Sequence, residues 1–196
     1  MRLPDRRTLL RSKGFTLIEL LVVIAIMAIL VGLAAPSFQE IIVRNHVKNA
    51  NLQLARDISF TRSEALKRGH SVTICNANAT WTACSTADGQ WQNGWIVFLD
   101  RDANSARSTV LANGEELIRV QQQVTGNVII QGLGGATVKT IRFDRSGDTS
   151  IASLTVDGDP NLSAAILQAV QKIICVATTG EVRTGPHGVN ACASIP

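Results

Sequence analysis

The sequence predicts an α+β protein, in which a long N-terminal helix with a membrane-spanning half and an amphipathic half packs on a mainly antiparallel β head. Three observations support this fold class: an unbroken apolar run near the N-terminus, a helical apolar stripe after it, and short β-like runs separated by turn residues in the rest of the chain. The 196 residues suffice for one head domain and one membrane segment. We therefore expect four parts: residues 1–14, 15–36, 37–69 and 70–196.

The first part, residues 1–14, is a basic leader. The chain has a formal net charge of +4, and the leader carries all of it, because one acid, Asp5, stands among five basic residues: Arg2, Arg6, Arg7, Arg11 and Lys13. In the remaining chain basic and acidic residues balance. A basic segment before an apolar one holds the N-terminus in the cytoplasm. The charge therefore predicts membrane topology and gives no argument for a polyanionic partner.

The second part, residues 15–36, is expected to cross a membrane. No polar side chain interrupts it between Leu20 and Ala35. A helix of this length nearly spans a hydrocarbon core of about 30 Å. A buried helix of a soluble protein is rarely apolar on every face for so long. The alternative is an ordinary signal peptide, cut after the apolar run near Ala34, Ala35 and Pro36.

The third part, residues 37–69, has the period of an amphipathic helix. Apolar and small residues recur at steps of three or four: Val43, Val47, Ala50, Leu54, Ile58, Thr61 and Ala65. Pro36 is expected to bend or loosen the helix where its two halves meet, and Gly69 is a suitable stop. A continuous helix over residues 15–68 would be about 80 Å long, as in a stalk.

The fourth part, residues 70–196, reads as mainly β. Short runs rich in β-branched and aromatic residues alternate with turns, at 71–75, 94–100, 116–120, 127–130, 140–143, 153–156, 172–177 and 180–184. Residues 157–171 fit this pattern poorly, since 162–170 could form a short helix or extend a strand.

Cys75, Cys84, Cys175 and Cys192 all follow the apolar segment, where an oxidising compartment would favour disulfides. Four cysteines allow three pairings, and we favour Cys75 with Cys84 and Cys175 with Cys192 because each links neighbouring sequence. The chain has no C-x-x-C motif, and its three histidines show no ligand-like spacing to the cysteines. We therefore expect no metal site.

Asp100, Asp102 and Asn104 have the D-x-D-x-N spacing of some calcium loops. The glycine and the bidentate acid of that motif do not follow in register. The sequence therefore favours a solvated hairpin turn at this position.

Residues 13–19, K-G-F-T-L-I-E, resemble the junction of type IV prepilins and of the pseudopilins of type II secretion. The resemblance implies that a prepilin peptidase cuts after Gly14 and methylates the new amine of Phe15. The carboxylate of Glu19 costs about 2–3 kcal/mol near a bilayer centre, so it requires a positive partner. The resemblance implies that this partner is the N-terminal amine of an adjacent subunit. The alternative is that Glu19 snorkels to the membrane edge without a role in assembly.

Two further segments resemble FimT-type minor pilins and GspH-type pseudopilins: residues 61–69, T-R-S-E-A-L-K-R-G, and residues 91–100, W-Q-N-G-W-I-V-F-L-D. We expect Trp91, Trp95 and Phe98 to pack in the sheet core. The resemblance implies a minor pilin that assembles or primes a type IV pilus, with a pseudopilin of type II secretion as an alternative. Its partners would be prepilin peptidase, other pilin subunits and, before assembly, the inner membrane, with the head in the periplasm.

A third alternative is a DNA-binding minor pilin for natural transformation. In the FimT-type resemblance, a C-terminal G-R-x-R motif contacts phosphate, but residues 180–183 read G-E-V-R. Glu181 repels phosphate and could pair with Arg183, which leaves Arg183 and Lys172 as the candidate DNA contacts. The sequence contains no nucleophile elbow, phosphate loop or zinc-protease motif, so we expect neither catalytic residues nor a cofactor.

Overall fold

The computed structural model describes residues 14–87, 89–108, 114–186 and 192, with the side chains of 33–38 left out. Helix α1 (Leu17–Arg68) is assigned continuously through Pro36. The chain divides into two compact units after Gln39, so that α1 contributes to both. Within the described side chains, no helix offers an apolar stretch long enough to span a membrane.

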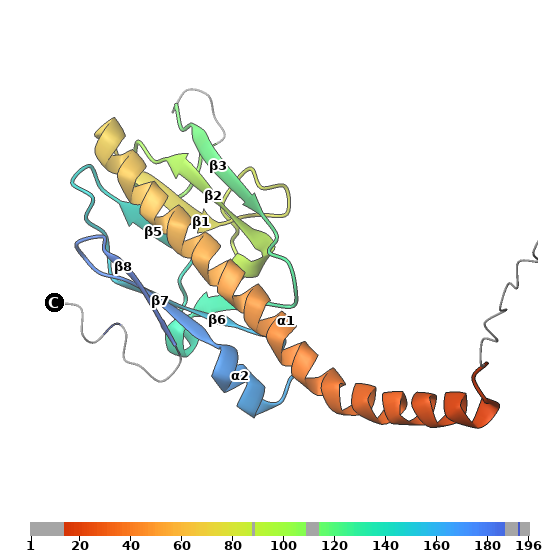
Figure 1. The fold of residues 1–196 in the computed structure, drawn as a ribbon. Helices are drawn as coiled ribbons and strands as arrows, with labels where there is room; N and C mark the ends of the chain where they lie inside the picture. Colours follow the sequence, from red (N-terminus) through yellow and green to blue (C-terminus); the bar gives the residue numbers. More distant parts are fainter. Residues whose placement is uncertain (1–13, 88, 109–113, 187–191, 193–196) are drawn as a thin grey trace, which may run out of the picture. The chain divides into compact units, whose positions relative to one another are not determined.

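The strands of the head form two four-stranded sheets (Figure 1). The first has the order β3 (Leu117–Gln122), β2 (Gly94–Leu99), β1 (Val72–Asn76), β5 (Thr140–Phe143). The second has the order β4 (Ile129–Gly132), β6 (Ala152–Asp157), β7 (Lys172–Val176), β8 (Val182–Pro186). All six strand pairs are antiparallel. Each predicted β run overlaps one of these strands, and the antiparallel α+β prediction is confirmed.

The segment that the sequence left undecided contains helix α2 (Ala164–Val170). Ser163 precedes it in an extended conformation, and Val170 at its end is buried in the core. The helical alternative for residues 157–171 is therefore the one that the structure adopts.

One face of α1 packs in the core of the second unit. The predicted stripe is buried at Val47, Ala50, Leu54, Ile58, Thr61 and Ala65, and Val43 packs partly buried at its edge. The same core contains side chains from both sheets, among them Ile74, Phe143, Leu154 and Ile174. Because one core joins the helix and the two sheets, residues 40–68 are an integral part of the head's fold.

The predicted aromatic residues are buried on two faces of the first sheet. Trp91, in the 3₁₀ turn η1 (Trp91–Asn93), and Trp95 lie in the main core. Phe98 lies in a smaller cluster with Cys75 and Ile96, because side chains alternate between the faces of a strand. Packing therefore accounts for all three aromatic side chains.

Each of the two sheets has one disulfide, which joins one of its strands to a cysteine further along the chain. Cys75 in β1 bonds to Cys84, nine residues further along the chain. Cys175 in β7 bonds to Cys192, seventeen residues further along. The hydroxyl of Ser153 in β6 also donates to Cys192 Sγ at 3.1 Å. These are the two short-loop pairings that the sequence favoured.

Candidate functional site

The N-terminal part of α1 exposes apolar side chains on every face. From residue 14 to 32 every side chain is exposed, and the large apolar ones range from 47% exposed at Leu21 to 90% at Phe15. Soluble proteins rarely show so large a continuous apolar surface unless it contacts a membrane or another protein. Glu19 is the one charged residue of this stretch. The segment is therefore a candidate interaction site with a single carboxylate near its start.

Thr16 and Glu19 together form a capping box at the start of α1. Thr16 Oγ1 accepts a hydrogen bond from Glu19 N at 3.3 Å. In return, Glu19 Oε2 accepts hydrogen bonds from the backbone N and the hydroxyl of Thr16, at 3.1 and 3.2 Å. This reciprocal pairing satisfies amide groups that a helix start otherwise leaves free. The T-x-x-E spacing signals such a box, and our reading of the sequence missed it.

Only one carboxylate oxygen of Glu19 is used in the box. Glu19 Oε1 takes no hydrogen bond from the described part of the chain. Gly14 precedes the helix in an open position, where an added Cβ would meet no atom of the described residues within 4 Å. Phe15, the next residue, is almost fully exposed, so the bond between Gly14 and Phe15 is sterically accessible. The rest of the predicted leader lies outside the described residues.

Segment 61–69 anchors the C-terminal end of α1 to the head. Glu64 accepts a hydrogen bond from Arg68 Nε at 2.7 Å, and Arg68 Nη1 reaches Glu116, beside β3, at 2.7 Å. The hydrogen bond from Arg68 lowers the pKa of Glu64, and Lys67 adds to the effect. The residues that carry the family resemblance here are therefore ones that fix the helix to the sheet.

Arg62 connects this segment to the G-E-V-R segment. Arg62 Nε donates to the carbonyl of Gly147 at 3.1 Å. A Cβ at Gly180 would lie 2.3 Å from the Gly147 oxygen and 2.5 Å from Arg62 Nε, and Gly180 has φ +76°. No other residue fits this turn without strain. The glycine of G-E-V-R thus has a packing role against α1.

The two candidate DNA contacts are not brought together. Arg183 forms a two-fold hydrogen bond with Glu181, at 2.8 and 3.1 Å, and this pairing lowers the pKa of Glu181. Arg183 pairs across the sheet with Cys175, three positions from Lys172 on β7. Because side chains alternate along a strand, Lys172 and Arg183 emerge on opposite faces. Because Arg183 is paired with Glu181 and lies on the opposite face from Lys172, the structure gives no support to a phosphate-binding patch.

A helix with an exposed apolar start, followed by two antiparallel sheets that close a core on its second half, defines a pilin-like protein. A model of the family described as "Type II transport protein GspH" matches residues 50–180, and a model of the prokaryotic N-terminal methylation motif matches residues 9–35. The first match covers more than half of the chain, which therefore belongs to the GspH family.

The chain is also similar to individual fimbrial proteins and to a solved minor pilin structure. A fimbrial protein of Moraxella nonliquefaciens is 36% identical over 48% of this chain, and the match spans 59% of that protein. The type IV major fimbrial protein FimA of Dichelobacter nodosus is 29% identical over 60% of this chain and 69% of its own length. The crystal structure of the type IV minor pilin FimU of Pseudomonas aeruginosa superposes with a TM-score of 0.54, covering 73% of this chain and 90% of FimU at 13% identity. This last likeness shows the shared fold.

Proposed function

We propose that this chain is a minor pilin subunit, cut after Gly14 by a prepilin peptidase and methylated on Phe15, that helps to assemble or prime a type IV pilus. One observation carries the proposal: the apolar side chains at the start of α1 are exposed, although residues 40–196 form a core of their own. Such a surface is unfavourable in water, and packing against the similar helices of other pilin subunits would bury it. The role is structural, with no catalytic step and no cofactor.

Before assembly, residues 15–36 would lie in the inner membrane as a single span, with the head in the periplasm. Afterwards the same residues would lie in the interior of a filament. The basic leader and the balanced charge of the remaining chain favour this topology.

Glu19 would serve both its own helix and a neighbouring subunit. Its Oε2 is engaged with Thr16, while Oε1 takes no hydrogen bond within the described chain. Cleavage after Gly14 would create a positive amine at Phe15. In an apolar interior a carboxylate and an amine are each costly alone, and their pairing offsets much of that cost. Oε1 can accept the amine of an adjacent subunit without breaking the cap.

The capping box offers a way to separate charge from helix capping. Glu19→Gln removes the charge and keeps an oxygen that can accept from Thr16, whereas Thr16→Ala removes the capping hydroxyl and keeps the charge. We expect Glu19→Gln to insert in the membrane and to be depleted at least about ten-fold from sheared filaments, as a lost charge pair would cost more than 1.4 kcal/mol. Thr16→Ala should be incorporated much closer to wild type. The measurement is the ratio of filament-bound to membrane-bound protein by quantitative mass spectrometry. Normal incorporation of Glu19→Gln would refute the charge pair.

A pseudopilin of type II secretion is the second candidate, because the matching family carries the description of a type II transport protein. Deletion of the gene distinguishes the two roles. Fewer surface pili with normal protein secretion would support the minor pilin. Normal piliation with secreted enzymes retained in the periplasm would support the pseudopilin.

A further inference from the structure

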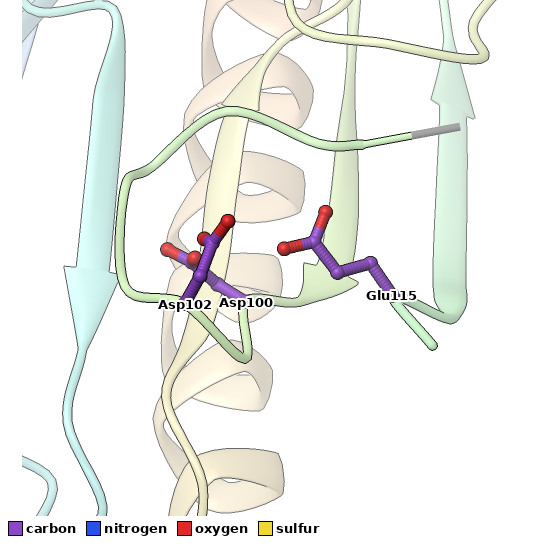
Figure 2. Close-up of side chains that lie close together, drawn as sticks. All are labelled: Asp100, Asp102 and Glu115. Atoms are coloured by element: carbon purple, nitrogen blue, oxygen red, sulfur yellow. The ribbon is translucent and has the colours of Figure 1, made fainter. Parts of the chain in front are cut away.

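The antiparallel pairing of β2 and β3 brings two acidic residues together beyond the ends of these strands. Phe98 pairs with Leu117, and Leu99 N donates to the Glu116 carbonyl at 2.9 Å. The next residues on the two strands are Asp100 and Glu115, which therefore lie opposite each other. Figure 2 shows that Asp102, in the turn after β2, adds a third carboxylate to this pair.

The three side chains form a compact oxygen cluster. One carboxylate oxygen from each residue lies within 4.8 Å of the other two. Asp100 is fully buried and Glu115 is 6% exposed, whereas Asp102 is exposed at the rim. The Glu115 carboxylate points toward the two aspartates (Figure 2). The cluster thus combines two buried carboxylates with one that reaches solvent.

No cationic side chain neutralises this cluster within the described residues. Arg101, which follows Asp100 directly, donates to the carbonyl of Gly114 at 3.1 Å. Glu115 Oε2 accepts from the backbone N of Ser108, but Glu115 Oε1 is buried and has no hydrogen-bond partner among the described residues. A buried carboxylate oxygen without a partner, aimed at two other carboxylates, is unfavourable unless a cation or a shared proton completes the cluster.

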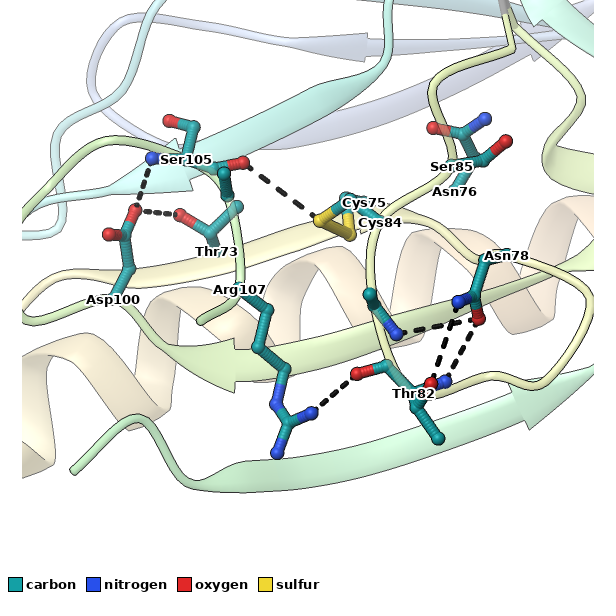
Figure 3. The surroundings of a disulfide bond; sticks show 12 residues. Thr73, Cys75, Asn76, Asn78, Thr82, Cys84, Ser85, Asp100, Ser105 and Arg107 are labelled. Atoms are coloured by element: carbon teal, nitrogen blue, oxygen red, sulfur yellow. Dashed lines mark hydrogen bonds between the residues drawn. A yellow bond between two sulfur atoms is a disulfide. The ribbon is translucent and has the colours of Figure 1, made fainter. Parts of the chain in front are cut away.

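Asp100 is held in place independently of any ion (Figure 3). Its Oδ2 accepts from Thr73 Oγ1 at 2.7 Å and from Ser105 N at 3.0 Å. Arg107, two residues after Ser105, is held in turn, because it donates to the carbonyl of Thr82 beside the Cys75–Cys84 disulfide. The inner ligand position is therefore preorganised by β1 and by the disulfide loop.

We propose that Asp100, Asp102 and Glu115 bind one calcium ion. The cluster offers oxygen ligands alone, which select a hard cation such as Ca²⁺ over zinc or copper. Magnesium requires near-ideal octahedral geometry and gives up its bound water reluctantly. Ca²⁺, in contrast, accepts six to eight oxygens in irregular arrangements. Carboxylates from two chain segments, with water on the open side, fit the looser requirement. The sequence favoured a solvated turn here because the glycine and the bidentate acid of a continuous calcium loop do not follow in register, and Glu115 comes close only through the pairing of β2 and β3.

A shared proton is the competing explanation for the cluster. Burial raises the pKa of Glu115, and the neighbouring carboxylates of Asp102 and Asp100 raise it further. A proton held between Glu115 and Asp102 would also satisfy the free oxygen. The two explanations differ in their response to calcium, since a proton-sharing pair without a site would not bind the ion with defined stoichiometry.

The test uses the full chain in a non-ionic detergent, freed of divalent ions. Calcium chloride is titrated by isothermal calorimetry, with magnesium chloride in a parallel titration. We expect one Ca²⁺ per chain with a Kd of about 0.1–1 mM, the range of extracellular calcium modules, and weaker magnesium binding. Glu115→Gln should weaken calcium binding at least ten-fold. Glu116→Gln is the matched control, because the adjacent Glu116 pairs with Arg68 outside the cluster.

Each outcome decides the proposal. Absence of calcium heat in the wild type, or equal binding by Glu115→Gln, overturns it. Equal weakening by Glu115→Gln and Glu116→Gln also overturns it, because it would indicate diffuse attraction of the ion by surface charge. Circular dichroism in EDTA establishes that Glu115→Gln is folded. If that variant does not fold, the exposed Asp102→Asn replaces it, with at least a three-fold loss expected and wild-type affinity refuting the site.

Discussion

The indole N–H of Trp95 donates to Asp57 Oδ2 at 2.8 Å, which links the buried face of α1 to the middle of the first sheet. The second oxygen of Asp57 accepts from Arg119 on β3. The Arg119 guanidinium also lies over the Phe60 ring, 3.7 Å from its centroid. Asp57 therefore joins one helix to two strands. Asp57 is only 5% exposed, and its carboxylate is tolerated there because both of its oxygens accept hydrogen bonds.

Replacing Asp57 should destabilise the head in proportion to the hydrogen bonds lost. Asp57→Ala leaves the Trp95 indole N–H buried without an acceptor, and we expect a loss of about 1–3 kcal/mol in the free energy of unfolding. Asp57→Asn keeps an acceptor for Trp95 and should lose less. Urea titration of the full chain in detergent, followed by tryptophan fluorescence, measures both. Equal stability of Asp57→Ala and the wild type would show that the Asp57–Trp95 hydrogen bond contributes nothing net to the free energy of unfolding.

The buried stripe of α1 can be tested by two leucines on opposite sides of the helix. Leu54 is fully buried, whereas Leu52 is 37% exposed. Leu54→Ala should cost about 2–5 kcal/mol, because it leaves a cavity between the helix and the sheets. Leu52→Ala should change the free energy of unfolding by about 0.5 kcal/mol or less. Similar losses in the same urea titration would contradict the assignment of the packed face.

The main elements of the fold could be predicted because they depend on local patterns. The stripe from Val47 to Ala65 follows the period of a helix, and each β run has the length and residue types of a strand. These signals do not depend on where the other elements lie. The stretch 157–171 has neither pattern clearly, which explains why α2 emerged only from the structure.

The polar contacts could not be predicted, because each depends on which strands are neighbours. Trp95 reaches Asp57 across 38 positions of sequence, and Arg68 reaches Glu116 across 48. Glu115 meets Asp100 only through the register of β2 and β3. The Thr16–Glu19 capping box is different, since both partners lie within one turn. Its signal was present in the sequence.

The Glu64–Arg68 contact should make stability depend on pH. Arg68 lowers the pKa of Glu64 below its ordinary value of 4.5. The native state therefore favours the ionised form, so this contribution is present above pH 4.5 and is lost as the pH falls through the lower native pKa. Glu64→Gln should be less stable than the wild type at pH 7, and the difference should shrink toward pH 3. A difference that stays constant with pH would assign the loss to packing. Glu40→Gln, from the exposed pair with Arg44, is the control and should have little effect.

The two disulfides should stabilise the head by different amounts. They close loops with sequence separations of 9 and 17 residues. Chain entropy alone assigns about 3 kcal/mol to each, and the longer loop about 0.5 kcal/mol more. Paired serine variants, Cys75→Ser with Cys84→Ser and Cys175→Ser with Cys192→Ser, separate the contributions in urea titrations. If both doubly substituted proteins match the wild type, neither bridge constrains the unfolded chain.

Gly14→Ala should abolish processing without disturbing the fold. Within the described part of the chain, an added Cβ at Gly14 meets no atom within 4 Å, so no steric clash there would explain a failure of cleavage. Gly32→Ala is the matched control, because its Cβ also meets no described atom within 4 Å and it lies in the same apolar stretch. Intact mass and N-terminal sequencing of membrane-extracted protein should give methylated Phe15 as the first residue for the wild type and for Gly32→Ala, and the complete leader for Gly14→Ala. A wild-type chain that begins near Pro36 would identify an ordinary signal peptide, and the apolar segment would then play no part in a filament.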